Sequence, residues 1–376
     1  MSKKVIITGV SGMDGSHMVD YLLENTDYEI YGVVRRLSIP NYRTNLASAL
    51  ENPRFKLVTA DLSDAHSIDK IIAKIKPDYF INLAAQSFVA ASWEVPEQTL
   101  DVNSNGVMRC LESILRHAPN CRFYNAGSSE EFGDVQYSPQ DEKHPLRARS
   151  PYGASKISAR QIVKTYRESY GLYAIQGYLF NHEGERRGEE FVTRKITKGV
   201  GRIKRTIGII KAQQALNNEV NWAIEFKPIE LGNLDAKRDW SYSPDFVDGI
   251  WKMLNQNIYR TDILFCDTNP KTIKEYVLSS NETHTIREFI ELAFKEAGFD
   301  NCMWEGEGVN EVYRYKDANG QTYQLVRINP EFYRPAEVAL LLGDSTLARE
   351  ELGWSPKCNF QQLVAKMVKN DIENCG

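Results

Sequence analysis

Short apolar runs alternate with amphipathic stretches through the first half of the chain. Residues 5–8 form the first apolar run, and residues 16–23 repeat apolar side chains at helical spacing. Further runs of strand length occupy residues 30–34, 55–59, 79–83, 123–125 and 174–179, with helical patterns between most of them. Strands that alternate with helices are typical of βαβ units. The pattern predicts an α/β fold with about six parallel strands in a doubly wound sheet.

The rhythm changes after about residue 180. The sequence becomes more polar and richer in loops, with helical patterns at residues 247–254, 286–297 and 360–368. We expect one domain over residues 1–180, to which later segments around 232–260 return. A smaller, mostly C-terminal domain is expected over residues 181–376, with insertions near 205–226 and 268–280. The length of 376 residues suits one large domain with a smaller partner.

Composition and charge exclude several classes of protein. Hydrophobic residues make up 42% and charged residues 26% of the chain, which is typical of a globular protein. The net charge of −4 gives no basic excess for binding nucleic acid. We find no apolar stretch long enough for a signal sequence or a membrane span, so we expect a cytoplasmic protein without membrane contact. The six cysteines lack Cys-x-x-Cys spacing, which predicts reduced thiols and no metal site.

Three glycines stand at the junction of the first predicted strand and helix. Gly9, Gly12 and Gly15 are spaced G-x-x-G-x-x-G, one residue off the commonest dinucleotide fingerprint. A dinucleotide pyrophosphate needs close backbone approach and the amides of a helix N-terminus, and such a junction offers both. The glycines would also suit a tight turn without a ligand. Their position favours the dinucleotide site, so the predicted sheet is of the Rossmann type.

The residues after the second and third predicted strands bear on the choice of cofactor. An NAD enzyme often carries an acidic residue after the second strand, whereas this chain has Arg35 and Arg36. Guanidinium groups favour a 2′-phosphate, so we predict NADP, with solvated surface arginines as the alternative. Asp61 and Leu62 follow the third strand and are expected at the adenine. Asp61 would equally suit a helix cap.

A tyrosine and a lysine four residues apart open a predicted helix. Tyr152 and Lys156 therefore share one helix face. A phenol with an ordinary pKa of about 10 acts as a base near neutrality only where positive charge stabilises the phenolate. Lys156 and an oxidised nicotinamide would supply that charge. An exposed pair on an amphipathic helix is the alternative, and the glycine motif favours the catalytic interpretation.

A second polar segment follows the fifth predicted strand. Carboxyl ends of strands are where α/β enzymes gather their catalytic groups. Ser128 can donate a hydrogen bond to a sugar hydroxyl, and a carboxylate at Glu130 can remove an acidified C–H proton beside a ketone. Glu130 and Glu131 would otherwise form a solvated acidic corner. Because adjacent side chains rarely face the same way, at most one of the two is expected to enter the site.

These motifs resemble the extended short-chain dehydrogenase/reductase family, and within it the GDP-mannose 4,6-dehydratase branch, over nearly the whole chain. The resemblance rests on residues 8–16, 34–36, 82–87, 150–156, 179–183, 186–188, 191–195, 232–240 and 333–338. Residues 186–188, 191–195, 232–240 and 333–338 are specific to the GDP-sugar branch. The resemblance implies an NADP-dependent lyase that converts GDP-mannose to GDP-4-keto-6-deoxymannose and water by internal hydride transfer from C4 to C6.

The resemblance also implies roles for single residues. Tyr152 would take the proton of the 4-hydroxyl, Lys156 would anchor the nicotinamide ribose, and Glu130 would handle the C5 proton, with Ser128 completing the catalytic set. Cofactor contacts are expected at Gly9, Gly12, Gly15, Arg35, Asp61, Leu62, Leu83, Gln86, Tyr152, Lys156, His182 and Arg187. GDP-sugar contacts are expected at Ser87, Asn181, Lys195, Arg238, Arg334 and Glu337. The family usually forms dimers or tetramers, so a homo-oligomer is expected.

Ser128 stands where the family usually has threonine, and because the hydroxyl is kept we expect the function to be kept with altered packing. Two other departures from the family pattern leave the sugar open, since Phe132 replaces a usual tyrosine and Phe88 replaces a polar residue near the sugar. The same chemistry on GDP-D-glycero-D-manno-heptose is therefore an alternative. A nucleotide-sugar 4-epimerase is less favoured, because epimerases of this fold need no carboxylate at Glu130. A non-catalytic NADP sensor is disfavoured by the intact catalytic set.

Overall fold

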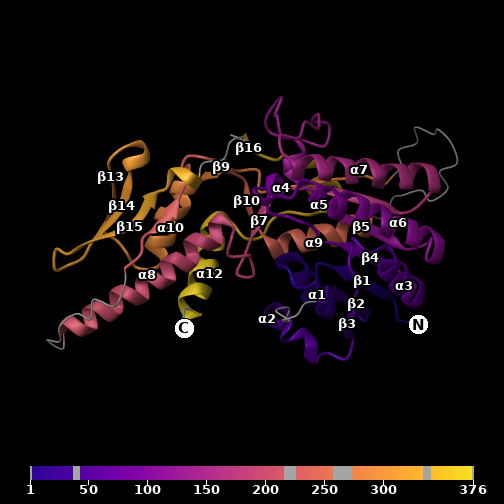
Figure 1. The fold of residues 1–376 in the computed structure, drawn as a ribbon, viewed down its shortest axis with the longest axis horizontal. Coiled ribbons are helices and arrows are strands. Elements are labelled where there is room, and N and C mark those ends of the chain that lie inside the picture. The colour runs from indigo at the N-terminus through magenta and orange to yellow at the C-terminus, as the bar shows by residue number, and fades with distance from the viewer. Residues whose placement is uncertain (1, 37–42, 216–225, 257–272, 333–339, 375–376) are drawn as a thin grey trace. The chain divides into compact units, whose positions relative to one another are not determined.

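The computed structural model describes residues 2–36, 43–215, 226–256, 273–332 and 340–374 (Figure 1). The chain divides into two compact units. The first unit consists of Met1–His182, Asp239–Glu282 and Leu341–Lys357. The second consists of Glu183–Arg238, Thr283–Leu340 and Cys358–Gly376. The chain therefore returns to the first unit twice after it has left it at residue 182.

A parallel sheet of seven strands forms the centre of the first unit. Its strands are β1 (Lys4–Thr8), β2 (Glu29–Val34), β3 (Phe55–Thr59), β4 (Tyr79–Asn82), β5 (Arg122–Ala126), β6 (Ala174–Leu179) and β11 (Val277–Leu278). Their order is β11-β6-β5-β4-β1-β2-β3, and each neighbouring pair is parallel. The strand order reverses between β1 and β4, as in doubly wound nucleotide-binding folds. The Rossmann-type sheet predicted from the sequence is confirmed.

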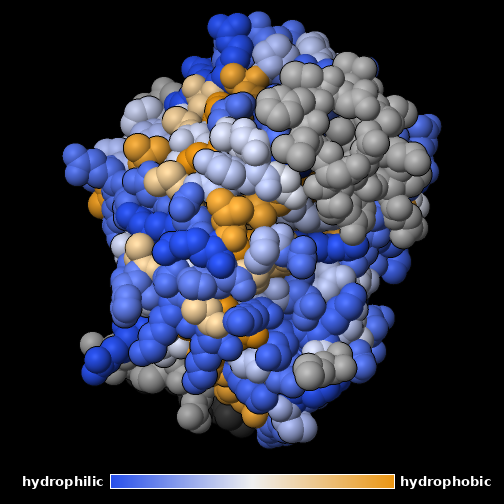
Figure 2. Space-filling view, turned by 90° about the vertical axis from the view of Figure 1, so that its right-hand side faces the viewer, coloured by the Kyte–Doolittle hydropathy of each residue, from blue (hydrophilic) through white to orange (hydrophobic). Residues whose placement is uncertain are grey.

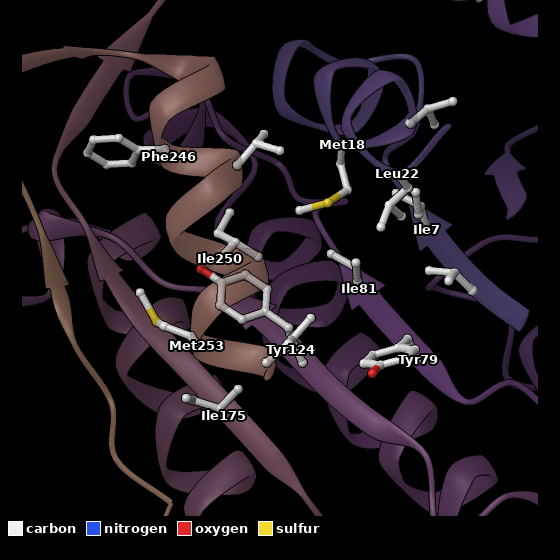
Figure 3. Packing of buried hydrophobic residues seen from close by; sticks show 14 of the residues in the cluster. Ile7, Met18, Leu22, Tyr79, Ile81, Tyr124, Ile175, Phe246, Ile250 and Met253 are labelled. Carbon is white, nitrogen blue, oxygen red and sulfur yellow. The ribbon is translucent and has the colours of Figure 1, made fainter. Parts of the chain in front are cut away.

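Helices cover both faces of this sheet because its strands bury side chains alternately on each face. Val5 and Ile7 of β1 pack with α1 (Met13–Asn25) and α9 (Ser243–Leu254). Ile6 packs on the other face with α3 (Ala65–Ile75), α6 (Gly106–His117) and α7 (Pro151–Tyr170). Figure 3 shows the first of these clusters, in which Tyr124 and Ile175 of the sheet meet Ile250 and Met253 of α9.

The boundaries of α7 follow from local sequence signals. Ser150 caps the helix by accepting a hydrogen bond from the Gly153 backbone at 3.0 Å, and Pro151 occupies the first helical position. Gly171 ends the helix in a left-handed conformation with φ of +69°, which glycine adopts without strain. The N-terminal turn of α7, which carries Tyr152, is therefore fixed by Ser150 and Pro151.

The second unit combines three helices with a small sheet. The helices α8 (Val192–Ala215), α10 (Ile286–Glu296) and α12 (Phe360–Glu373) contact one another. The sheet has the order β13-β14-β15-β8 and consists of β13 (Cys302–Glu305), β14 (Val312–Lys316), β15 (Thr322–Ile328) and β8 (Ile229–Leu231). Its pairs are antiparallel except for β15 with β8. The short strands β9 (Lys237–Arg238) and β12 (His284–Thr285) also pair.

Two predictions about the later half were wrong in part. The stretch 268–280 was assigned to the second region, but Val277–Leu278 forms β11 beside β6 in the first unit. A two-residue strand is too short to show any periodicity. The predicted insertion at 205–226 begins inside α8, which continues to Ala215. Residues 216–225 and 268–272 lie outside the described part of the chain.

The remaining elements are short. They are α2 (Arg43–Leu46), η1 (Ala49–Glu51), α4 (Ala91–Glu94), α5 (Pro96–Leu100), η2 (Asp101–Asn105), η3 (Ser129–Glu131), β7 (Asn181–Glu183), β10 (Trp240–Tyr242), η4 (Gly308–Asn310), η5 (Pro330–Phe332), β16 (Leu340–Leu341) and α11 (Thr346–Leu352). Among the helices of the described ranges, none combines the length and the hydrophobicity that a membrane span requires.

The face drawn in Figure 2 is mostly hydrophilic, with hydrophobic residues in small patches.

A buried carboxylate connects the second and third stretches of the first unit and predicts a pH dependence of its stability. Asp239 accepts hydrogen bonds from the Ser280 backbone at 2.8 Å, the Ser280 hydroxyl at 2.7 Å and the Gly343 backbone at 3.3 Å. Burial raises the pKa of Asp239 from 3.8 to about 6. Because the folded pKa exceeds the unfolded one, this contribution to stability is present below pH 3.8 and is lost as the pH rises through 6.

We therefore expect the destabilisation caused by Asp239→Asn to shrink by about 2 kcal/mol between about pH 4 and pH 7. Urea unfolding of the two proteins at both pH values measures this difference. If Asp239→Asn destabilises the protein equally at both pH values, the raised pKa of Asp239 is contradicted.

Candidate functional site

The glycine motif forms a tight loop between β1 and α1. Gly9 has a left-handed φ of +65°, and a Cβ atom on it would lie 2.7 Å from the Ala84 nitrogen. A Cβ atom on Gly15 would lie 2.3 Å from the Gly9 carbonyl oxygen. Gly12 is the N-cap residue of α1 and has no side chain to cap the helix, so no side-chain cap occupies this helix end. The loop thus brings bare backbone to the N-terminus of a helix, which is what a dinucleotide pyrophosphate requires.

Four buried side-chain oxygens of the first unit, those of Gln86, Tyr124, Asn181 and Ser241, have no hydrogen-bond partner among the described residues, and two of them belong to predicted binding residues. One is Gln86 Oε1, in the loop after β4, and the other is Asn181 Oδ1. The rest of the Gln86 residue is engaged, because its backbone N–H donates to Asn103 Oδ1 at 2.8 Å and its Nε2 to the Phe88 carbonyl at 3.2 Å. Buried polar atoms are nearly always satisfied in folded proteins, so both oxygens fit contact with a bound group that donates hydrogen bonds.

Other predicted cofactor residues of the first unit, and the predicted sugar contact Ser87, differ in how far they are buried. Arg35 is exposed at the end of β2, and Leu83 is partly buried beside Gly9. Asp61 Oδ1 accepts hydrogen bonds from the Ser63 backbone at 2.9 Å and its hydroxyl at 2.7 Å. The cap of α3 is Asp64, so the alternative of a helix cap at Asp61 is wrong. Leu62 is buried and Ser87 is exposed.

His182 is tied to the first turn of α1. Its Nδ1 lies 2.8 Å from the Phe180 carbonyl oxygen, and its Nε2 lies 2.8 Å from Asp14 Oδ2. The ring stacks on Phe246 with centroids 4.5 Å apart. Ser243 donates a hydrogen bond to the other Asp14 oxygen at 2.7 Å. The His182 side chain therefore lies beside the first turn of α1, which follows the glycine loop. Asp14, for which the sequence predicted no role, orients the His182 ring.

Ser128 and Glu130 lie in a short turn after β5. The Ser128 hydroxyl caps η3 by accepting a hydrogen bond from the Glu130 backbone at 3.2 Å. Glu130 is partly buried, whereas Glu131 is completely buried. A Cβ atom on Gly153 would lie 2.6 Å from the Glu130 carbonyl oxygen, so the first turn of α7 rests against this turn. The two catalytic segments predicted from distant stretches thus meet in the first unit.

Tyr152 and Lys156 lie on one face of α7, and both are largely buried. The Lys156 ammonium donates a hydrogen bond to the Ala126 carbonyl at 2.8 Å and lies 5.7 Å from the centre of the Tyr152 ring. Burial lowers the pKa of Lys156 from 10.5 to about 8. Most of the lysine is still protonated at neutral pH, so a positive charge is available close to the phenol.

Among its described residues, the second unit holds three of the predicted binding residues. Arg187 Nε lies 3.0 Å from Glu183 Oε2, and the guanidinium stacks 3.4 Å from the Phe191 ring centre. The Lys195 ammonium lies 4.0 Å from the centre of the Phe332 ring, and burial lowers the pKa of Lys195. Arg238 is buried and donates to the Lys237 carbonyl at 2.8 Å. The predicted sugar contacts Arg334 and Glu337 lie outside the described residues.

Comparison with known proteins identifies the family. A family profile described as GDP-mannose 4,6 dehydratase matches residues 6–367. The chain belongs to the GDP-mannose 4,6-dehydratase family. A family member from Drosophila melanogaster is 40% identical over 99% of this chain and 86% of its own length, and one from Vibrio cholerae is 40% identical over 99% and 95%. The human relative is 38% identical over 98% of this chain and 91% of its own length.

Several solved structures share the fold of this GDP-mannose 4,6-dehydratase family member. RMD from Pseudomonas aeruginosa, solved with NADPH, has a TM-score of 0.70 at 19% identity and covers 99% of both chains. A dTDP-glucose 4,6-dehydratase from Bacillus anthracis, solved with NAD, has a TM-score of 0.72 at 19% identity, covering 99% of this chain and 97% of that chain.

The sequence of this GDP-mannose 4,6-dehydratase family member predicted no role for two residues next to the predicted catalytic residues, Glu131 and Arg160. Glu131 forms a buried ion pair with Arg160, in which Arg160 Nε lies 2.5 Å from Glu131 Oε2. Tyr152, Lys156 and Arg160 are each four residues apart, so the sequence places Arg160 on the same side of α7 as the other two. No local pattern indicated which of the two adjacent glutamates faces inward.

Proposed function

We propose that this protein is an NADP-dependent GDP-mannose 4,6-dehydratase that converts GDP-mannose to GDP-4-keto-6-deoxymannose and water. The observation that carries the proposal is the meeting of two segments in the first unit. The turn with Ser128 and Glu130 rests against the helix turn with Tyr152, through the close approach at Gly153. The segments that meet carry a phenol, an ammonium, a hydroxyl and a carboxylate, which are the groups that the proposed reaction needs. The relatives' names supply the substrate.

The residues of the first unit fit a nicotinamide dinucleotide. The glycine loop exposes backbone at the N-terminus of α1, and Gln86 Oε1 and Asn181 Oδ1 are buried oxygens that lack donors among the described residues. The exposed pair Arg35 and Arg36 favours NADP, because guanidinium groups bind a 2′-phosphate. When bound, NADP supplies the acceptance and return of a hydride. The residues that would hold it are the three loop glycines, Arg35, Asp61, Leu62, Leu83, Gln86, Tyr152, Lys156, His182 and Arg187.

In the proposed reaction, side chains of this protein transfer the protons of the sugar. Tyr152 takes the proton of the 4-hydroxyl as C4 is oxidised to a ketone, and Lys156 stabilises the phenolate. Ser128 holds the oxygen at C4 by a hydrogen bond. The ketone acidifies the C5 hydrogen, which Glu130 removes as a proton and passes to the C6 hydroxyl, so that this group leaves as water. The proton that Tyr152 takes from the 4-hydroxyl balances the one that C5 regains in the product. Ser87, Asn181, Lys195, Arg238, Arg334 and Glu337 would bind the GDP-sugar.

Mass spectrometry of the purified enzyme with GDP-mannose tests the proposal, because the product should weigh one water less than the substrate. An epimerised product of unchanged mass would contradict it. Assembly into dimers or tetramers stays a prediction from the resemblance, and a cytoplasmic location stays a prediction from the sequence.

We expect Glu130→Gln to lower the formation of product by about 10²–10⁴-fold, because the C5 proton then has no acceptor. Oxidation at C4 does not need this carboxylate, so the near-ultraviolet absorbance of reduced nicotinamide should still appear when GDP-mannose is added. Normal turnover by this variant would remove the role assigned to Glu130.

A further inference from the structure

A row of buried polar side chains crosses the sheet of the first unit at one level. Thr8, Asn82, Asn125 and Gln176 are direct register partners across β1, β4, β5 and β6. Each residue is at most 2% exposed. The Thr8 hydroxyl donates to Asn82 Oδ1, and each amide nitrogen then donates to the next amide oxygen, at 2.7 and 2.6 Å. Because the hydrogen bonds all run in one direction, every amide of this row has a single orientation.

The row ends at Glu131, which is adjacent in sequence to Glu130, the proposed base for the C5 proton. Gln176 Nε2 donates to Glu131 Oε1 at 3.1 Å and to the Lys156 carbonyl at 3.0 Å. The same Glu131 oxygen accepts a hydrogen bond from the Ser128 backbone at 2.8 Å. Gln176 and the fully buried Glu131 therefore connect the turn of Ser128 to the helix turn that carries Lys156.

Arg160 compensates the charge of this buried carboxylate. Arg160 Nε donates to Glu131 Oε2 at 2.5 Å, while its Nη1 donates to Glu275 Oε2 at 2.5 Å. The guanidinium also lies 3.5 Å from the centre of the Tyr178 ring. A Cβ atom on Gly127 would lie 2.7 Å from Glu131 Oε1, so the backbone leaves room for the pair. A buried carboxylate needs such pairing, because its desolvation is otherwise costly.

We infer that Glu131 is a positioning residue, which fixes the Ser128 turn and holds the Lys156 ammonium in its working position without touching the sugar. This inference deepens the proposed function, on which it rests, because it concerns the same site. One carboxylate oxygen receives donors from the Ser128 turn, from Arg160 and from Gln176, so a shift of this carboxylate moves both catalytic segments.

The charges around Lys156 give the inference a second measurable consequence. The ammonium bonds to the Ala126 carbonyl of β5 and lies near the Tyr152 ring of α7. Burial lowers the pKa of Lys156 to about 8, Glu131 opposes this shift, and Arg160 adds to it. Removal of the Glu131 charge leaves burial and the Arg160 charge unopposed, and both favour the neutral amine of Lys156.

The test is the isosteric substitution Glu131→Gln. Arg160 keeps its second partner, Glu275, so the guanidinium stays paired. We expect kcat for GDP-mannose to fall about ten- to a hundred-fold, because small displacements of catalytic groups have effects of this size. We also expect the titration of Lys156 to move to lower pH. Carbon-13 NMR of the substrate-free protein with labelled lysines measures that titration, and Lys156→Met assigns the signal.

Glu275→Gln is the matched control. It removes an equally negative partner of Arg160, but Glu275 makes no hydrogen bond to the Ser128 turn among those of the described residues. The Lys156 titration should therefore stay at its wild-type midpoint in this variant. Equal shifts in Glu131→Gln and Glu275→Gln would overturn the inference, and so would an unchanged midpoint together with unchanged kcat in Glu131→Gln.

A milder substitution covers the case in which Glu131→Gln does not fold. Glu131→Asp keeps the charge and withdraws the carboxylate by one methylene group. We expect a lower kcat with a nearly unchanged Lys156 titration, and wild-type kcat in this variant would overturn the inference. The NMR titration needs no turnover, so it stays informative if the wild-type protein leaves GDP-mannose unchanged and the proposed function fails.

Discussion

Tyr152→Phe is expected to lower turnover of GDP-mannose by about 10²–10⁴-fold. The substitution removes only the phenolic oxygen, so no group remains to accept the proton of the 4-hydroxyl. The Lys156 ammonium stays hydrogen-bonded to the Ala126 carbonyl and cannot replace the base, because it is protonated at neutral pH. Oxidation at C4 is the first step, so no reduced nicotinamide should form when GDP-mannose is added.

This outcome differs from the one expected for Glu130→Gln, in which reduced nicotinamide forms and product does not. A near-ultraviolet absorbance measurement with GDP-mannose and one equivalent of enzyme distinguishes the two variants. NADP affinity, measured by fluorescence, serves as the control and should change little in Tyr152→Phe, since the ring is retained. Rapid formation of reduced nicotinamide in Tyr152→Phe would show that another residue is the base.

Gly15→Ala is expected to weaken NADP binding by about ten- to a hundred-fold. The new methyl group would lie 2.3 Å from the Gly9 carbonyl oxygen and 2.7 Å from Val10 Cα. Both neighbours are backbone atoms, so the loop itself has to move, at a cost of about 1–3 kcal/mol. The displaced loop would no longer present its backbone to a pyrophosphate. Titration calorimetry with NADP measures the loss.

Gly208→Ala is the matched control for this substitution. Gly208 is an exposed residue of α8, and a Cβ atom on it meets no other atom within 4 Å. The same chemical change should therefore leave NADP binding unchanged and stabilise the helix by roughly 0.5–1 kcal/mol. Equal NADP affinities of the two variants would contradict the role assigned to the glycine loop.

Most of the central sheet could be predicted because its strands carry strong local signals. β3 and β6 begin and end where the apolar runs do, and Gly9 marks the turn between β1 and α1. β11 could not be found in this way, because its two residues gain their stability from pairing with β6, which no local pattern records. Three glycines and many basic residues obscured α8, although Ile196, Val200 and Ile203 repeat at helical spacing on its buried side.

In the candidate site, the placement of the proposed reacting groups Tyr152 and Lys156 was predictable from the sequence, but that of the residues that support them was not. Tyr152 and Lys156 share a helix face at a fixed spacing, so their proximity follows from sequence. The contact between Gly153 and the Glu130 carbonyl depends on how α7 packs on the sheet, and that packing is tertiary. The inward direction of Glu131 depends on Arg160 in the same way, because a buried carboxylate needs a partner that adjacent residues do not reveal.

The polar row across β1, β4, β5 and β6 also bears on how the chain finds its fold. A slip of one residue between two of these strands would turn a buried amide to the opposite face of the sheet and leave its former neighbour unsatisfied. Each such group would cost about 1–3 kcal/mol. Apolar strands alone would tolerate misalignment more readily, since one branched aliphatic side chain packs much like another. Thr8, Asn82, Asn125 and Gln176 therefore select one alignment of four parallel strands during folding.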